Sequence, residues 1–166
     1  ISILAGANQP TSGTILFQGR EVTLHSVHDA RELGISAVFQ EFSLIPQMTV
    51  EENLFLGAEP TTRGFLDRRR SRDHAREILE ELDFRIDPLA TVDRLTRAEQ
   101  QMVEIAKAFR SDLSVLILDE PTASLTNHET DQLFKLIGDL TARGIGIVYI
   151  THRMAEIRRI GKRITV

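Results

Sequence analysis

The stretch Val115-Leu116-Ile117-Leu118-Asp119-Glu120-Pro121-Thr122 decides the fold, because an apolar run leads directly into two adjacent carboxylates and a proline. An unbroken apolar run is typical of a strand covered on both faces, as in a parallel sheet. Ligands of α/β folds bind beyond the carboxyl ends of such strands. One carboxylate there can hold a Mg²⁺-bound water while its neighbour orients or deprotonates an attacking water. Taken alone, the Asp-Glu pair favours a simpler alternative, a buried strand that ends in a solvated acidic turn.

Length, charge and cysteine content limit the possible classes of protein. A chain of 166 residues is about one domain long and can build a real core. Its net charge of −4 provides no basic field of the kind that nucleic-acid binders carry. The basic cluster at residues 68–72 precedes several acidic residues, so we interpret it as the solvated start of a helix rather than a phosphate-binding patch. The absence of cysteine excludes disulfides and thiol chemistry, and it fits a cytoplasmic protein.

The two ends of the chain carry weaker signals. Residues 1–6 lack the basic start and long apolar stretch of a signal peptide, and they predict the last turn of a helix capped by Gly6. A chain that opens inside a helix is expected to continue a longer upstream sequence. At the other end we expect a short helix over about 154–160 and a last strand over 163–166. The longest apolar run, about 145–150, is too short to span a bilayer.

The order of strands and helices predicts an α/β fold. We expect an antiparallel hairpin and then three buried strands, at 14–18 with 21–24, and at 35–39, 115–118 and 145–150. Four pairs of residues predict helix starts as capping boxes: Ser26 with Asp29, Thr49 with Glu52, Thr96 with Glu99, and Thr126 with Glu129. Between them, one helix stripe is made by Ala75, Ile78, Leu79 and Leu82. We therefore expect a helical subdomain at 46–110, inserted into an α/β core of residues 1–45 and 111–166.

Polar side chains follow the three strongest strands. Gln40 follows the first, Asp119 and Glu120 end the second, and His152 follows the third. Strand–helix–strand connections of this length imply parallel pairs with right-handed crossovers, so these side chains are expected at one edge of the sheet. A carboxamide, two carboxylates and an imidazole form a set that can activate water and assist a metal ion. Each residue alone is more often an ordinary hydrogen-bonding loop residue, but the four together favour a site.

These motifs resemble those of the ATP-binding subunits of ABC transporters. Residues 115–120 look like the Walker B strand with its catalytic glutamate, and residues 123–126 look like the D-loop. Gln40 resembles the Q-loop glutamine, and His152 resembles the switch histidine. The order and spacing of all four elements match, and the resemblance covers essentially the whole chain. It implies a partial P-loop NTPase sheet with an inserted helical subdomain and a short antiparallel β segment.

Three phrases are similar to a narrower group, the bacterial importers of ribose-, galactose- or xylose-type sugars. They are residues 39–46, 101–108 and 151–157. The ATPase subunit of that group carries two tandem ATPase domains, and the chain resembles most of the first. The resemblance implies a peripheral protein on the cytoplasmic face of the plasma membrane. Its partners would be membrane-spanning permease subunits, a second ATPase domain and, indirectly, a periplasmic sugar-binding protein, but not nucleic acid. The sugar stays open, because selectivity lies in other subunits of this family.

The resemblance also implies ATP and Mg²⁺ as ligands and gives each motif residue a role. Asp119 would hold Mg²⁺ through water, since a hard cation prefers oxygen ligands. Glu120 would polarise the water that attacks the γ-phosphate. His152 would contact the γ-phosphate, and Gln40 would reach the metal or the water. The segment at 41–57 would touch the membrane subunit.

Two departures from the family pattern bear on activity. No Gly-x-x-x-x-Gly-Lys-[Ser/Thr] loop is present, so we interpret the chain as a fragment whose phosphate-binding loop lies upstream. Without the strand before that loop we expect a gap in the central sheet, with marginal stability or pairing of the exposed edges with a second copy. The family signature Ser-Gly-Gly-Gln, which would contact the ATP of a partner domain from a helix N-terminus, is replaced by Thr96-Arg97-Ala98-Glu99. A plain helix cap is the alternative there.

Two other functions remain open from the sequence. A soluble ABC-type ATPase that acts on DNA or ribosomes usually has basic surfaces or coiled-coil arms, and the sequence shows neither. A degenerate or regulatory domain that binds partners without turnover is favoured by the altered signature and the absent loop. The intact set of Gln40, Asp119, Glu120 and His152 argues instead for ATP hydrolysis by the parent protein.

Overall fold

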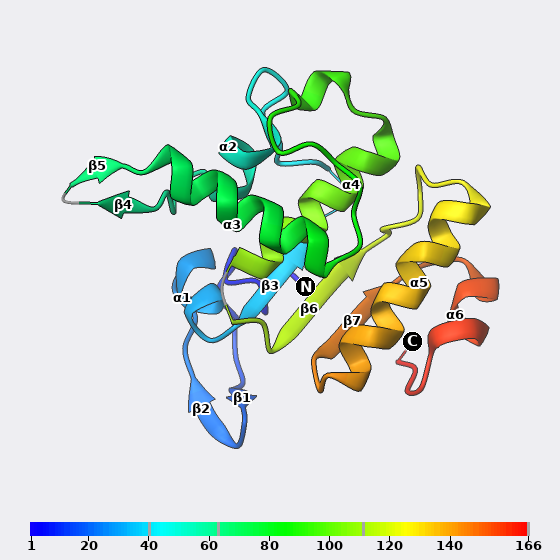
Figure 1. Ribbon diagram of the computed structural model, residues 1–166. Coiled ribbons are helices and arrows are strands. Elements are labelled where there is room, and N and C mark those ends of the chain that lie inside the picture. Colours follow the sequence, from blue (N-terminus) through cyan, green and yellow to red (C-terminus); the bar gives the residue numbers. More distant parts are fainter. Residues whose placement is uncertain (40, 63, 111, 166) are drawn as a thin grey trace.

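A parallel three-stranded sheet lies at the centre of the molecule (Figure 1). The computed structural model describes residues 1–39, 41–62, 64–110 and 112–165. In spatial order the strands are Ile35–Val38 (β3), Val115–Asp119 (β6) and Gly146–Ile150 (β7). The register places Val38 beside Leu118, and Asp119 beside Ile150. All three strands therefore end at the same edge, and the parallel sheet that the apolar runs predict is confirmed.

The apolar run of β6 is buried on both faces. Leu116, Ile117 and Leu118 are only 1%, 0% and 0% exposed. Leu116 and Leu118 belong to one apolar cluster with the helix Asn127–Ala142 (α5), whereas Ile117 belongs to another with Leu24. Figure 1 shows α5 over β7 and beside β6. Because full burial of such a side chain stabilises the fold by about 2 kcal/mol, the run that predicts the strand also anchors it.

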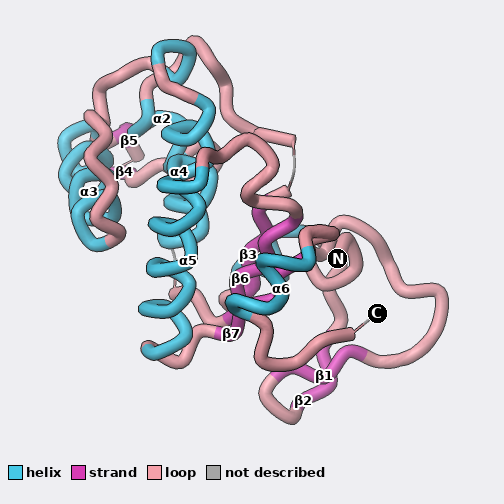
Figure 2. The backbone as a smooth tube through the Cα atoms, turned by 90° about the vertical axis from the view of Figure 1, so that its right-hand side faces the viewer, coloured by secondary structure: helices cyan, strands magenta, loops and turns pink. Residues whose placement is uncertain are grey.

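Three helices between β3 and β6 build a separate apolar core. They are Val50–Phe55 (α2), Arg68–Glu81 (α3) and Arg97–Ala106 (α4). The predicted stripe of α3 lies in this core and comprises Ala75, Ile78, Leu79 and Leu82. Val50 and Val103 pack against it from α2 and α4. Figures 1 and 2 show α2 and α3 together on one side of the sheet. This second core supports the proposal that residues 46–110 form an inserted subdomain.

Two short hairpins project from these cores. Ile15–Phe17 (β1) and Arg20–Val22 (β2) pair antiparallel, as the sequence predicts. Thr61–Thr62 (β4) and Phe65–Leu66 (β5) form a second hairpin that was not predicted. Figure 2 shows the two hairpins far apart, with β4 and β5 near α3. The remaining helical segments are Val27–Glu32 (α1), Met154–Ile160 (α6) and the 3₁₀ turns Val92–Arg94 and Lys107–Arg110. None of the described helices is both long and apolar enough to cross a membrane.

All three predicted Thr-x-x-Glu capping boxes form, at the starts of α2, α4 and α5. They are Thr49 with Glu52, Thr96 with Glu99, and Thr126 with Glu129. Each such cap stabilises its helix by about 1 kcal/mol. The predicted box of Ser26 and Asp29 is arranged differently. Ser26 Oγ accepts the N–H of Asp29 at 3.2 Å, while the Asp29 carboxylate accepts the N–H of His25 at 2.8 Å. Helix α1 nevertheless begins directly after Ser26, as expected.

The sequence predicts the last turn of a helix capped by Gly6, and the structure has a hydrogen-bonded turn there rather than a helix. The N–H of Ala5 donates to the carbonyl of Ile1 at 2.9 Å. Gly6 follows with φ +73°, a conformation that glycine adopts freely. A Cβ at this position would lie 2.1 Å from the carbonyl oxygen of Ser26, so no other residue fits without moving the backbone.

Two predictions about the sheet are wrong. Residues 163–165 form no strand, because they are exposed and no described strand lies alongside to pair with them. Val166 lies outside the described residues. The expected gap in the central sheet is also missing, since β6 pairs with β7 directly, from Val115 beside Gly146 onward. Among the described strands, the edges without a partner are the outer edges of β3 and β7.

Candidate functional site

The carboxyl ends of β6 and β7 bring Glu120 and His152 into direct contact. Glu120 Oε1 accepts the backbone N–H of His152 at 3.0 Å and lies 2.8 Å from the ring atom Nδ1. The N–H of Glu120 donates to the carbonyl of Ile150 at 3.0 Å, which continues the β6–β7 pairing past the strands. Gln40, the third expected member of this edge, lies outside the described residues. A hydrogen-bonded carboxylate–imidazole pair therefore lies at this edge of the sheet.

Glu120 has a backbone conformation that residues other than glycine rarely adopt. Its φ is +49°, in the left-handed region. That conformation costs an L-residue about 1 kcal/mol, and strain of this kind clusters at functional sites. Here it turns the chain out of β6 just before Pro121, so that the carboxylate reaches the end of β7. The strain points to a role for Glu120 beyond folding.

In this pair the carboxylate is largely buried, whereas the imidazole is exposed to solvent. The side chain of Glu120 is 16% exposed, whereas that of His152 is 82% exposed. Oε1 makes both contacts to His152, and within the described part of the chain Oε2 has no hydrogen-bond partner. Because Nδ1 faces Glu120, Nε2 is the ring atom of His152 that remains to meet a ligand. One carboxylate oxygen and one ring nitrogen are thus available for chemistry.

Asp119 occupies the last position of β6, at the same edge. Its carboxylate makes no hydrogen bond or ion pair with another described residue. The described residues contain no group of three or more His, Cys, Asp or Glu side chains that could hold a metal ion by themselves. Mg²⁺ needs no such group, since it commonly binds one or two carboxylates together with water and substrate phosphates. The free oxygens of Asp119 therefore fit a hydrated Mg²⁺.

Sequence reasoning missed Glu156, a buried carboxylate on α6 that is 5% exposed. Thr122 Oγ1 donates to its Oε1 at 2.6 Å. Tyr149 Oη and Thr151 Oγ1 donate to its Oε2 at 2.8 and 3.0 Å. Arg153 Nη1 lies 3.0 Å from Oε1. Glu156 therefore joins the segments that follow β6 and β7, the same segments that carry the Glu120–His152 pair.

The surroundings of Glu156 keep it ionised. Burial alone would raise its pKa, but the hydroxyl hydrogen bonds and the Arg153 guanidinium outweigh burial and lower the pKa below its usual value of 4.5. Burial raises the pKa of Tyr149, and the hydrogen bond to Glu156 adds to that rise. At neutral pH a carboxylate therefore accepts from a neutral phenol. The sequence offered one hint, since helical spacing places Glu156 one turn before Ile160, which packs on the sheet.

The residues that resemble the family signature form the start of α4. Glu99 folds back on Thr96, and its Oε2 accepts the N–H and the hydroxyl of Thr96 at 2.8 and 2.9 Å. The Arg97 guanidinium lies over the ring of Phe42, 5.5 Å from its centroid, and Ala98 is buried. In this arrangement the side chains form a plain helix cap. A contact from them to a nucleotide remains a proposal.

A groove of about 590 Å³ joins the start of α4 to the segment that follows β6. Its lining includes Phe42, Arg97 and Gln100 together with Ala123 and Ser124. Ala123 and Ser124 belong to the stretch that resembles the D-loop, and Arg97 belongs to the stretch that resembles the signature. Residues of both motifs thus line one groove.

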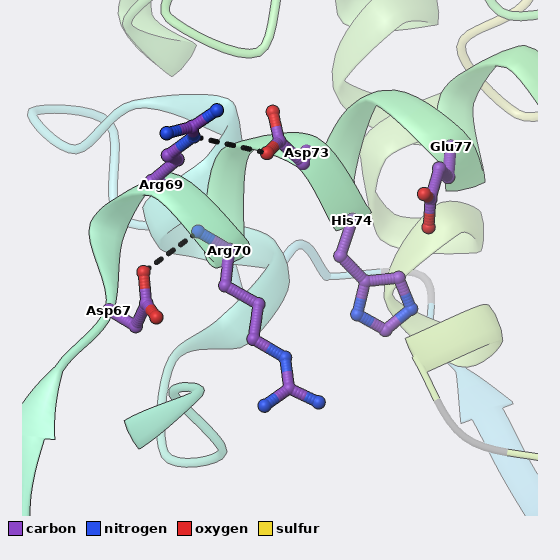
Figure 3. A pocket seen from close by; sticks show the side chains of 6 residues that line it. All are labelled: Asp67, Arg69, Arg70, Asp73, His74 and Glu77. Atoms are coloured by element: carbon purple, nitrogen blue, oxygen red, sulfur yellow. Dashed lines mark hydrogen bonds and ion pairs between the residues drawn. The ribbon is translucent and has the colours of Figure 1, made fainter. Parts of the chain in front are cut away.

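Another surface pocket, of about 470 Å³, lies on α3 and contains none of the strand-end residues. Figure 3 shows its lining, which comprises Asp67, Arg69, Arg70, Asp73, His74 and Glu77. Arg69 lies 3.9 Å from Asp73, and Asp67 accepts the backbone N–H of Arg70 at 3.0 Å. Because both acidic and basic groups line it, the pocket does not have the uniformly positive charge that would favour a phosphate. We therefore place the site at the strand ends.

The chain is similar to known proteins along its full length. The protein-family model described as "ABC transporter" matches residues 1–123. "Ribose import ATP-binding protein RbsA 1" of Rubrobacter xylanophilus is 49% identical over 166 residues, covering 100% of the chain and 33% of that protein. "Galactose/methyl galactoside import ATP-binding protein MglA" of Escherichia coli (strain K12) is 46% identical over 166 residues, with 100% and 33% coverage. The chain spans about a third of the length of the curated relatives it matches.

Solved structures show the same fold. The ADP conformation of an ATP-binding cassette of an ABC transporter superposes with a TM-score of 0.79 at 22% identity, covering 96% of the chain and 66% of that structure. A nucleotide-free ATP-binding cassette gives 0.78 at 22% identity, with 96% and 67% coverage. At such identities the likeness shows the fold alone. The predicted α/β sheet of the P-loop NTPase type is confirmed.

Proposed function

The chain belongs to the ABC transporter family, and we propose that it supplies the water- and metal-handling half of an ATPase site in a bacterial sugar importer. Relatives that import ribose or galactose support the sugar-import part. The observation that carries the hydrolytic part is the Glu120–His152 contact at the carboxyl ends of adjacent parallel strands. Because the chain spans about a third of these relatives, the activity is proposed for the whole protein.

Glu120 is proposed to orient and polarise the attacking water. Its Oε1 stays bonded to the N–H and Nδ1 of His152, so its Oε2 can accept a hydrogen bond from that water and take up a proton. His152 is held by the same contact, and its exposed Nε2 can donate to a phosphate oxygen when it carries a proton. Phosphoryl transfer depends mainly on such positioning and on stabilisation of charge, since the protein does little covalent chemistry.

ATP and Mg²⁺ are the proposed ligands. Asp119 would hold Mg²⁺ through water, and the bound ion neutralises charge on the phosphates. We propose that Gln40, outside the described residues, reaches the metal or the water. We further propose that Thr96, Arg97, Ala98 and Glu99 give only a weak contact to the ATP of a second ATPase domain. The closed box between Thr96 and Glu99 supports this, because their polar groups already bond each other.

The proposed place of work is the cytoplasmic face of the plasma membrane. The proposed partners are membrane-spanning permease subunits, a second ATPase domain and, indirectly, a periplasmic sugar-binding protein. The relatives named as import ATP-binding proteins support these partners. The net charge of −4 supports the exclusion of nucleic acid. The segment at 41–57, which includes Phe42 in the groove beside α4, is proposed to contact the permease.

Substitution of Glu120 in the full-length protein tests the hydrolytic role. We expect Glu120→Gln to abolish steady-state ATP hydrolysis while ATP binding is retained, because the amide keeps the shape but cannot take up the proton of the water. ATP binding is followed by equilibrium dialysis and turnover by phosphate release. The matched control is Glu77→Gln, an exposed position on α3, which should keep wild-type turnover. Unchanged turnover in Glu120→Gln would refute the role of Glu120.

The second candidate is a degenerate or regulatory domain that binds partners without turnover. One observation favours it, namely that Glu99 is folded into the helix cap instead of being free. Phosphate release by the wild-type full-length protein, assembled with its permease, separates the two functions. Sustained turnover that Glu120→Gln abolishes supports the ATPase. Absence of turnover, with ATP binding and permease assembly intact, supports the regulatory domain.

A further inference from the structure

We propose that Glu156 is a positioning residue for ATP hydrolysis, because its carboxylate fastens the segment that follows Glu120 to the segment that presents His152. This inference rests on the proposed function of the Glu120–His152 pair. Glu156 has no place in that pair itself, since its oxygens bond hydroxyls and a guanidinium rather than Glu120 or His152. It acts through the backbone segments that carry them.

The contacts of Glu156 reach both segments at short range. Thr122 comes two positions after Glu120, and Thr151 comes directly before His152. The two carboxylate oxygens divide between them, with Oε1 accepting from Thr122 at 2.6 Å and Oε2 accepting from Thr151 at 3.0 Å. A single rigid carboxylate therefore sets the separation of the two segments on one side, while the Glu120–His152 contact sets it on the other.

The turn that presents His152 is closed by the same network. Thr151 Oγ1 donates to Glu156 and also accepts the N–H of Arg153 at 3.0 Å. Arg153 in turn lies 3.0 Å from Glu156 and 3.4 Å from Thr122 Oγ1. Both neighbours of His152 in the chain are thus fixed to Glu156. The imidazole itself stays exposed, so its position depends on this turn rather than on packing around the ring.

Burial makes this arrangement specific. Glu156 is 5% exposed and Thr122 is 1% exposed. A buried carboxylate is costly unless its oxygens are bonded, and an apolar side chain of similar volume would often serve stability as well. The ionic network is therefore better explained by the geometry it imposes than by the stability it adds. Misplacement of a reacting group by about 1 Å can cost about 100-fold in rate.

Kinetics of the full-length protein with its permease test this role. We expect Glu156→Gln to lower kcat by about 10- to 100-fold while KM for ATP changes by less than about 2-fold, because Glu156 is buried and its oxygens bond protein side chains. The second pair of variants is Thr122→Val, which removes the hydroxyl at nearly constant volume, and Thr122→Ser, which keeps it. Thr122→Val should lower kcat in the same way, and Thr122→Ser should restore most of it.

A double-mutant cycle distinguishes a positioning role of Glu156 from a role in stability alone. If Glu156 acts through His152, Glu156→Gln should cause little further loss of kcat in a His152→Ala background. Losses that multiply, or wild-type kcat in both Glu156→Gln and Thr122→Val, would overturn the inference. If Glu156→Gln fails to fold, the Thr122 pair carries the test alone. If Glu120→Gln is inactive while the Glu156 and Thr122 variants are fully active, only this inference is refuted. If Glu120→Gln is active, the proposed function is refuted.

Discussion

Glu120 keeps its left-handed backbone although glycine would adopt that conformation without strain. Glu120→Gly and Glu120→Ala both remove the carboxylate, but only the glycine relieves the backbone. We therefore expect the glycine variant to be the more stable of the two by about 1 kcal/mol. Thermal unfolding of the two full-length variants measures this difference. Both variants lack the carboxylate, so we expect neither to hydrolyse ATP. Equal melting temperatures would mean that Glu120 is not strained in solution.

At the same scale, the sequence predicted the polar residues at the strand ends but not the hydrogen bonds that support them. Asp119, Glu120 and His152 stand at the ends of apolar runs, which is a local signal. The bonds of Glu156 to Thr122 and Tyr149 span 34 and 7 positions along the chain. Hydrogen bonds over such separations follow no sequence period, so only the folded arrangement of β6, β7 and α6 reveals them.

At the scale of elements, success depended on how local the stabilising interaction is. Helix starts at Thr49, Thr96 and Thr126 were predictable because a capping box is complete within four residues. The prediction of a strand over 163–166 failed, because a strand needs a neighbouring strand to pair with and apolar content alone does not supply one. The order of the three parallel strands was likewise hidden, since it depends on where the crossovers pack.

A substitution at the start of helix α4 can test whether Thr96 only caps the helix or also contacts a ligand. Thr96→Ala and Thr126→Ala each remove the hydroxyl of a closed capping box, so both should destabilise the protein by about 1 kcal/mol. Because the hydroxyl of Thr96 is already used by Glu99, we expect the two variants to lose similar, small fractions of ATP turnover. Thermal unfolding gives the melting temperatures of the two variants, and phosphate release is measured for both at one temperature. A much larger loss of turnover in Thr96→Ala would show that Thr96 contacts nucleotide.

At the scale of the whole molecule, polar contacts link the helical core to the sheet. Glu104 on α4 accepts the N–H of Ser43, in the segment that follows β3, and lies 3.6 Å from Lys107 Nζ. Arg110 Nη1 donates to the carbonyls of Leu54 and Leu56 at 3.3 and 3.1 Å. These contacts join α4 to the segment that follows β3, and α2 to the 3₁₀ turn that precedes β6. The helical core is therefore fastened to the chain both after β3 and before β6.

Several of the carboxylates that hold the molecule together should make it sensitive to acid. Hydrogen bonds from Ser26 lower the pKa of Asp29, and the N–H of Thr49 lowers the pKa of Glu52. Hydrogen bonds and Arg153 lower the pKa of Glu156 against the effect of burial. A carboxyl group whose pKa is lowered in the folded state binds fewer protons there than in the unfolded chain. Its contribution to stability is present above its usual pKa and is lost as the pH falls through the folded value.

The melting temperature of the full-length protein should therefore change little between about pH 7 and pH 5 and fall as the pH drops below the usual glutamate value of 4.5. Glu156→Gln should melt at a lower temperature than the wild type at pH 7, because the amide cannot accept all the hydroxyl bonds. The gap between the two curves should close in acid, since a protonated Glu156 in the wild type loses the same interactions. Scanning calorimetry in matched buffers measures both curves. A gap that stays constant or widens as the pH falls would show that Glu156 is not held ionised by Thr122, Tyr149 and Arg153.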